Sequence, residues 1–128
     1  MPNVELNAGL LAAAEKLNLS VQIGNTISTD DYYEAQARRD GAFCDFSEDE
    51  KMAYLKRAHD DRAIRNFEME ATMMLAFATR ANVKAAVICV TYLNRLIGDR
   101  DGEQEDVDPV VFEQRPLKTV LQYIVDKQ

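Results

Sequence analysis

Residues 83–93 read Val-Lys-Ala-Ala-Val-Ile-Cys-Val-Thr-Tyr-Leu, and this stretch decides the predicted fold. It is almost uninterrupted apolar sequence. Strands covered on both faces, as in parallel sheets, have this composition, whereas half-exposed strands alternate apolar and polar residues. The stretch therefore predicts a buried strand of a parallel sheet, with Cys89 as a small buried side chain.

Helices and two further strands are expected around this stretch. Apolar residues recur at helical spacing in four segments: 6–17, 48–60, 73–81 and 117–124. Ser47-Glu48-Asp49-Glu50 matches a capping box before the second helix, and Pro116 is expected in the first turn of the last. Extended or β-branched runs predict strands at 21–28 and 64–69. In the third helix, the stripe of Met73, Met74 and Phe77 is expected to pack in the core.

The predicted order α-β-α-β-α-β-α is typical of an α/β fold, a layered sheet flanked by helices. A chain of 128 residues has the size of one domain, so residues 1–128 are expected to form a single domain. In open α/β sheets, ligands bind beyond the carboxyl ends of the strands. This rule points to the residues after Ser28 and to residues 67–70 and 92–95.

Charge and composition exclude several classes of function. The chain has 15 Lys and Arg against 22 Asp and Glu, a formal charge of −7, whereas a nucleic-acid backbone requires a basic face. One His and two widely separated Cys predict no metal site. No apolar run reaches the ~18 residues of a membrane span, and no signal or transit peptide is recognisable, which predicts a cytoplasmic protein. The acidic stretch 99–108 is expected to be an exposed loop.

Two carboxylates flank a thioether where a strand is predicted to meet a helix. Residues two apart in an extended segment face the same side, so Glu68 and Glu70 could point into one crevice beside Met69. Such a group suits a sugar, because carboxylates accept hydrogen bonds from hydroxyls while the apolar side chain packs against the ring. The alternative is that Glu70 only places negative charge at the helix N-terminus.

A second pair, Gln36 and Arg38, follows the aromatic residues Tyr32 and Tyr33. An amide offers a donor and an acceptor, and a guanidinium offers a planar donor fork, so together they could bind the edge of a carbonyl-rich base. The alternative is a solvated polar loop. Arg95, after the predicted buried strand, is either catalytic or paired with the acidic loop that follows it.

Taken together, these motifs resemble the uridine phosphorylases, especially the animal-type enzymes, within the nucleoside phosphorylase superfamily. The matching segments follow one order over nearly the whole chain: Gly24-Asn25-Thr26, Asp31-Tyr32-Tyr33-Glu34-Ala35-Gln36-Ala37-Arg38-Arg39-Asp40-Gly41-Ala42, Arg65-Asn66-Phe67-Glu68-Met69-Glu70, Val87-Ile88-Cys89-Val90-Thr91-Tyr92-Leu93-Asn94-Arg95 and Gln114-Arg115-Pro116. Gln-x-Arg with an aromatic lead-in, followed by Glu-Met-Glu, is a specific combination. The resemblance implies the C-terminal part of a nucleoside phosphorylase fold, with the N-terminal half absent.

The resemblance implies a base site. Gln36 and Arg38 would bind the amide and carbonyl edge of uracil, and Tyr32 would stack on the base where the family usually has Phe. The other base-site residues would be Tyr92, Leu93 and Arg95, the last supporting the carbonyl side of the base.

The resemblance also implies a ribose site. Met69 and Glu70 would hold the ribose, and Glu68 would line the same site. Asn94 stands where related purine phosphorylases carry an Asp, which favours a pyrimidine nucleoside over the purine or nucleosidase alternatives. Preference for uridine over deoxyuridine or thymidine stays open.

The implied reaction is phosphorolysis of uridine to uracil and ribose 1-phosphate. Uracil leaves as an anion through an oxocarbenium-like state, so the residues that would stabilise its carbonyl oxygens are the catalytic candidates, namely Arg38, Gln36 and Arg95. Inorganic phosphate is the co-substrate, and no cofactor is implied. The family's Gly-rich phosphate loop is implied to lie in the absent half, so the chain alone is expected to be inactive.

The alternative function is that of a catalytically inactive, truncated family member. It would act as a nucleoside-binding or subunit-association module, because a truncated sheet leaves an edge and an apolar surface that favour a partner. The complete protein would be a homo-oligomer.

Overall fold

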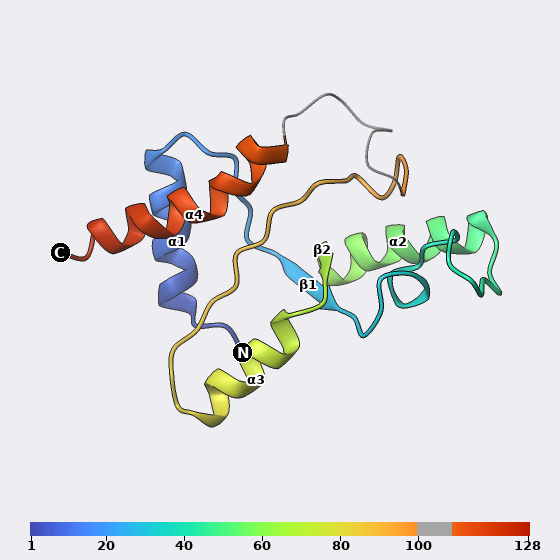
Figure 1. The fold of residues 1–128 in the computed structure, drawn as a ribbon, viewed down its shortest axis with the longest axis horizontal. Helices are drawn as coiled ribbons and strands as arrows, with labels where there is room; N and C mark the ends of the chain where they lie inside the picture. The colour runs from blue at the N-terminus through green and yellow to red at the C-terminus, as the bar shows by residue number, and fades with distance from the viewer. Residues whose placement is uncertain (100–108) are drawn as a thin grey trace. The chain divides into compact units, whose positions relative to one another are not determined.

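The computed structural model describes residues 1–99 and 109–128. The chain forms two compact units (Figure 1). Of the described residues, the helical unit comprises 1–23, 73–92 and 109–128, and the sheet unit comprises 24–72 and 93–99. The expectation of a single domain over residues 1–128 stays a prediction.

The helical unit is built on two helices that pack against each other, α1 (Val4–Lys16) and α4 (Pro109–Val125) (Figure 1). A helix was predicted in the segment of α1. Asn3 caps its start, where the Asn3 side chain accepts from the backbone N–H of Leu6 at 3.0 Å. Gly9 allows the close approach, because a Cβ there would lie 2.3 Å from the ring of Tyr123. The two helices therefore bury small residues of α1 against α4.

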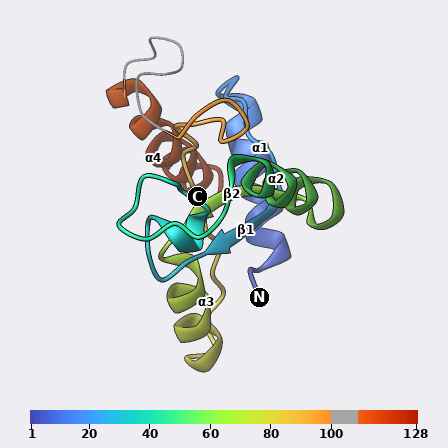
Figure 2. The same ribbon diagram turned by 90° about the vertical axis from the view of Figure 1, so that its right-hand side faces the viewer.

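The sheet unit holds two parallel strands, β1 (Asn25–Ser28) and β2 (Ile64–Glu68) (Figure 2). The helix α2 (Glu48–Arg62) connects them and packs on β2, with Leu55 almost fully buried. Ser47 and Glu50 form the predicted capping box at the start of α2. Ser28 pairs with Glu68 at the carboxyl ends of both strands, so these two ends lie side by side.

A third helix, α3 (Ala71–Arg80), follows β2 directly. The predicted apolar stripe exists, but the prediction that it lies in the core is wrong, because Met73 and Phe77 are 69% and 72% exposed and Met74 is also exposed. Helical spacing shows only that one face of a helix can be buried. Which element covers that face depends on tertiary packing, and none of the described elements does so here.

The strand predicted from residues 83–93 is wrong. Residues 83–94 form neither helix nor strand, and Cys89, expected to be buried, is exposed. A strand needs a neighbouring backbone to pair with, and among the described residues β1 and β2 form a sheet of only two strands. The α/β class is nevertheless confirmed, because a small parallel sheet is flanked by helices.

Two element boundaries and one additional element also differ from expectation. β1 begins at Asn25 and not at residue 21, and a short 3₁₀ helix, η1 (Glu34–Gln36), was not predicted. The expectation that Pro116 lies in a first turn is wrong, because α4 begins at Pro109, so Pro116 lies within the helix. A proline fits the first position of a helix, because the backbone N–H that it lacks would have no partner in the helix there. Pro109 occupies this position in α4.

Two further observations concern the predicted loop and membrane insertion. Residues 100–108 of the predicted exposed loop lie outside the described residues, and Asp99, its first residue, is largely buried, which corrects the expectation there. Within residues 1–99 and 109–128, no helix is both long and apolar enough to cross a bilayer.

Candidate functional site

The candidate site lies in the sheet unit, beyond the carboxyl ends of β1 and β2. Thr29 follows β1, and its backbone N–H donates to the carbonyl of Glu68 at 2.8 Å. The Thr29 hydroxyl accepts from the side-chain amide of Gln36 at 3.1 Å and lies 3.4 Å from that same Glu68 carbonyl. Thr29 therefore brings the Gln36 side chain and the end of β2 to one place, where α/β sheets bind ligands.

The loop that carries Gln36 and Arg38 is fixed by local hydrogen bonds. The carboxylate of Asp31 accepts from the backbone N–H of Tyr33 at 2.7 Å and of Ala35 at 3.2 Å, at the start of η1. Ala37 then has a φ of 55°, which ends η1 between Gln36 and Arg38. Both side chains are buried, with 5% exposure each. A solvated polar loop does not fit this burial.

Arg38 lies against Tyr32. Its guanidinium carbon is 3.9 Å from the centroid of the Tyr32 ring, a cation–π contact, and its Nη1 donates to the backbone carbonyl of Asp99. Tyr33 contacts the Tyr32 ring edge-on. One face of the proposed stacking ring is thus covered by Arg38, while the ring remains half-exposed.

Arg95 is held against the same loop. Its Nη2 donates to the backbone carbonyls of Gln36 at 2.8 Å and Ala37 at 3.2 Å. Its Nε donates to the carboxylate of Asp99 at 2.8 Å, so Arg95 pairs with the first residue of the acidic stretch, one of the two alternatives drawn from the sequence. Within the part of the chain that the structure describes, two buried donors have no partner, Arg38 Nε and Arg95 Nη1. Such donors are available to a ligand.

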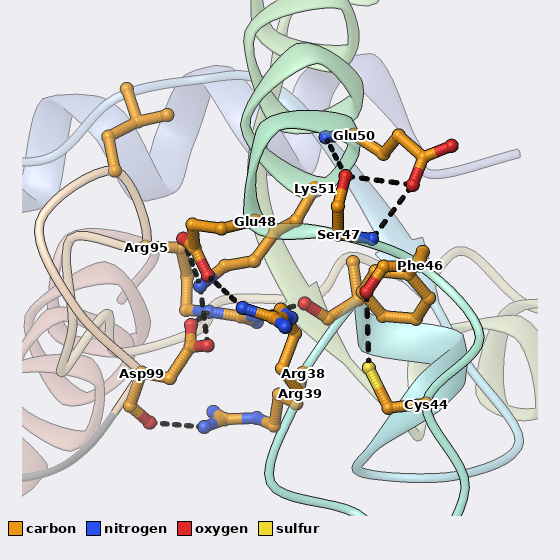
Figure 3. A network of polar contacts seen from close by, with 12 residues as sticks. Arg38, Arg39, Cys44, Phe46, Ser47, Glu48, Glu50, Lys51, Arg95 and Asp99 are labelled. Carbon is orange, nitrogen blue, oxygen red and sulfur yellow. Dashed lines mark hydrogen bonds and ion pairs between the residues drawn. The ribbon is translucent and has the colours of Figure 1, made fainter.

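Asp99 is the centre of a network of buried charges (Figure 3). Lys51 Nζ lies 2.6 Å from Asp99 Oδ2 and 3.0 Å from Glu48 Oε1. Burial by itself would raise the pKa of Asp99, but hydrogen bonds from Lys51 and Arg95 outweigh it, and the pKa is lowered. Burial by itself would lower the pKa of Lys51, but Asp99 and Glu48 raise it above its ordinary value. Both groups are therefore charged at neutral pH.

An open pocket of about 380 Å³ lies beside this network. Arg39, Lys51, Arg95 and Asp99 are among its lining residues, whereas Gln36 and Arg38 are not. Of the predicted base-site residues, Arg95 lines this pocket.

Acid is expected to weaken the contribution of Asp99 to stability. Its folded-state pKa lies below 3.8, so this contribution is complete above pH 3.8 and is lost as the pH falls through the lower folded-state pKa. The free energies of unfolding of wild type and Asp99→Asn, measured in urea from roughly pH 6 to pH 2, should converge as the pH falls. The other carboxyl groups titrate in both proteins, so their contributions cancel in the difference between the two free energies of unfolding. A difference independent of pH would contradict this assignment.

The Glu-Met-Glu segment is turned toward backbone donors at the start of α3. Glu68 Oε2 accepts from the backbone N–H groups of Ala71 at 2.6 Å and Glu70 at 2.7 Å. Glu70 Oε2 accepts from the N–H of Met69 at 2.9 Å. The carboxylate of Glu68 thus lies at the N-terminus of α3, where the alternative drawn from the sequence placed Glu70, and the extended geometry assumed from the sequence ends at Glu68. The thioether of Met69 is exposed.

Glu68→Ala is expected to lower the free energy of unfolding by about 0.5–2 kcal/mol, as for the loss of a helix cap. The reason is that Glu68 satisfies two backbone donors that would otherwise lack a protein partner. Glu70→Ala is the matched control, since the exposed Glu70 accepts only from Met69, and it should cost less. Equal losses in a urea titration would contradict the capping role of Glu68.

The remaining base-site candidates, Tyr92 and Leu93, are adjacent in sequence but belong to different units. Tyr92 lies in the helical unit, where its hydroxyl donates to the carboxylate of Glu113 at 3.0 Å. Leu93 begins the second segment of the sheet unit and is half-buried. Their placement in a base pocket stays a prediction.

Within the described residues, no three His, Cys, Asp or Glu side chains are grouped so that they could hold a metal ion. The one histidine, His59, is exposed and lies 2.9 Å from Asp60.

Sequence reasoning missed three residues of this site. Thr29 lies where the strand-end rule pointed, but the rule names a place and not a side chain. Lys51 resembles any helix lysine in the sequence, and Asp99 is one of many acidic residues in its stretch. Only the contacts of their side chains distinguish them.

Comparison with known proteins supplies the family. The protein-family model described as "Phosphorylase superfamily" matches residues 1–126 of this chain. The chain is 37% identical to "Uridine and thymidine phosphorylase" of Caenorhabditis elegans, over 93% of this chain and 40% of that protein. It is 39% identical to "Uridine phosphorylase 1" of Mus musculus, over 95% of this chain and 39% of that protein.

A solved structure gives the same result. The uridine phosphorylase of Schistosoma mansoni in complex with thymine aligns with a TM-score of 0.88 at 36% identity, over 98% of this chain and 44% of that chain. The chain thus spans about 40% of the length of the curated relatives that it matches. From the family match and these likenesses, the chain belongs to the phosphorylase superfamily, as its resemblance to the uridine phosphorylases predicted.

Proposed function

We propose that this chain provides the base- and ribose-binding part of a uridine phosphorylase, which converts uridine and phosphate into uracil and ribose 1-phosphate. The observation that carries the proposal is that Gln36 and Arg38 are buried in one loop beyond the carboxyl ends of the strands, and that Arg95 donates to the backbone of that loop. Among the residues that the structure describes, two of its guanidinium nitrogens have no hydrogen-bond partner.

The cluster has the chemistry that a uracil ring requires. Arg38 and Arg95 each retain a buried donor that can bind a carbonyl oxygen, and the Gln36 amide can both donate and accept. Uracil gains negative charge on its carbonyl oxygens as the glycosidic bond breaks, and fixed guanidinium groups stabilise this charge more than the neutral substrate. A placed donor of this kind contributes roughly 2.7–4 kcal/mol to a transition state.

We assign the ribose to the Glu-Met-Glu segment. Met69 is exposed beside the end of β2, so its thioether can pack on a sugar ring. Glu70 is exposed as well, and it can exchange the N–H of Met69 for a ribose hydroxyl at little cost in solvation. Glu68 keeps its backbone contacts and lines the site.

A pyrimidine nucleoside is the proposed substrate class. Solved structures of Schistosoma mansoni uridine phosphorylase hold uracil, thymine and thymidine, and this chain is 34–36% identical to them. We propose that inorganic phosphate binds to a part of the fold that this chain does not span, and that no further cofactor is needed. The isolated chain is therefore expected not to split uridine.

Ligand titration tests the proposal. In a ¹H–¹⁵N spectrum of the chain, uracil and uridine should shift the side-chain signals of Gln36, Arg38 and Arg95, and inosine should not. A comparison of deoxyuridine with uridine tests deoxyribose against ribose on the same base. No shift with saturating uracil, or shifts confined to other residues, would refute the base site. Rapid uracil release from uridine and phosphate by the chain alone would refute the assignment of the phosphate contacts.

A second candidate function is association with a complete uridine phosphorylase. It is favoured by the exposed apolar side chains of α3, Met73, Met74 and Phe77, which would be buried by a partner. Sedimentation of the chain with and without such an enzyme tests it, and Phe77→Glu should abolish any complex. A chain that sediments alone in the presence of the enzyme would exclude this role.

A further inference from the structure

Lys51 is a buried charged group that the proposed reaction does not use. Its side chain is 6% exposed, although it lies on a helix with many exposed charged residues. Burying an ammonium group is costly unless its partners compensate for the lost water. Lys51 has two such partners, Asp99 at 2.6 Å and the exposed Glu48 at 3.0 Å (Figure 3). The arrangement therefore needs a reason beyond surface charge.

The partner of Lys51 also holds both arginines of the proposed base site. One carboxylate oxygen of Asp99 binds Lys51, and the other accepts from Nε of Arg95 at 2.8 Å. The backbone carbonyl of Asp99 accepts from Nη1 of Arg38. Each guanidinium is thus fixed on one side, while Arg38 Nε and Arg95 Nη1 stay unpartnered.

We propose that Lys51 and Asp99 are positioning residues, which hold the guanidinium groups of Arg38 and Arg95 so that their unpartnered donors meet the ligand. The proposal rests on the base site of the proposed function. Asp99 sets the orientation of Arg95 directly and supports Arg38 through its backbone. Lys51 fixes the Asp99 carboxylate, which otherwise could rotate about its side-chain bonds. Neither residue contacts the base itself.

Two variants test the contact of Lys51 with Asp99 and the contact of Asp99 with Arg95. Lys51→Met keeps the length of the side chain and removes its charge. Asp99→Asn keeps the shape of the side chain and the backbone carbonyl that Arg38 binds, but it turns an N–H₂ group toward Lys51 or Arg95. Lys51→Arg restores a cation and is the rescue variant. Glu48→Gln is the control, because it removes the charge of the exposed partner of Lys51 and leaves both residues of the Lys51–Asp99 pair unchanged.

Two readouts separate positioning from general stability. The first is the Nε–H signal of Arg95 in a ¹H–¹⁵N spectrum, assigned with Arg95→Lys, which reports its bond to Asp99. It should move or broaden in Lys51→Met and Asp99→Asn while the backbone signals of β1 and β2 keep their positions. The second is uracil affinity, which should fall about tenfold in both variants, since outer partners of binding groups have effects of that size. Lys51→Arg should recover both, and Glu48→Gln should change neither.

An unmoved Arg95 signal in both variants, or uracil affinity equal to wild type in Asp99→Asn, would overturn the proposal. If the wild-type chain does not bind uracil but the Arg95 signal responds and Lys51→Arg restores it, the proposed base site fails while the positioning of Arg95 by Lys51 and Asp99 stands. The two proposals can therefore fail independently.

Discussion

Arg38→Ala weakens uracil binding about 10- to 100-fold in the expected titration, the effect of losing a hydrogen bond from a charged donor. The expectation follows from the burial of Arg38 and from its unpartnered Nε, which in the proposed complex donates to a uracil carbonyl. A buried carbonyl oxygen without a donor loses its water and gains nothing in return. The measurement is calorimetric or spectroscopic titration of the chain with uracil.

Arg39→Ala is the matched control for Arg38→Ala. Arg39 is the next residue, but it is exposed and pairs with Glu48 at 3.3 Å, so uracil affinity should stay at the wild-type value. Arg38→Lys adds a second comparison, because it keeps the charge and loses the planar fork that can bind two acceptors. Equal affinities for Arg38→Ala and Arg39→Ala, with both proteins folded by circular dichroism, would remove Arg38 from the base site.

Leu55→Ala is expected to cost about 2–5 kcal/mol of the free energy of unfolding, the range for large-to-small changes in a core. Leu55 is the largest apolar residue among the buried core positions described in the sheet unit, and its helix α2 packs on β2. Among the described residues the sheet has two strands, so few other contacts can take over this burial. Urea unfolding followed by circular dichroism measures the loss.

Leu117→Ala makes the same chemical change on α4, where the side chain is exposed. It should change the free energy of unfolding by less than about 0.5 kcal/mol. Losses of similar size in Leu55→Ala and Leu117→Ala would show that α2 does not anchor the sheet unit.

Local signals in the sequence identified part of the site. Asp31, the aromatic pair and the Gln-x-Arg spacing lie in one short loop, and the predicted strand ends marked where that loop would meet β2. What the spacing did not determine is the burial of Gln36 and Arg38, because it depends on Arg95 and Asp99, about sixty residues further along the chain. The contacts of Glu68 with the start of α3 likewise depend on where β2 ends.

The sequence by itself determined the elements whose hydrogen bonds are local. It predicted α1, α2 with its capping box, α3, the core of β2 and the family, because helical periodicity, caps and motifs depend on residues a few positions apart. Only the tertiary structure decided the conformation of residues 83–93, the exposure of the α3 stripe and the contacts of Lys51 and Asp99. The physical reason is that a strand, a buried face and a buried charge each need a partner from a distant part of the chain. The sequence next to the strand, face or charge does not show which distant residues will be that partner.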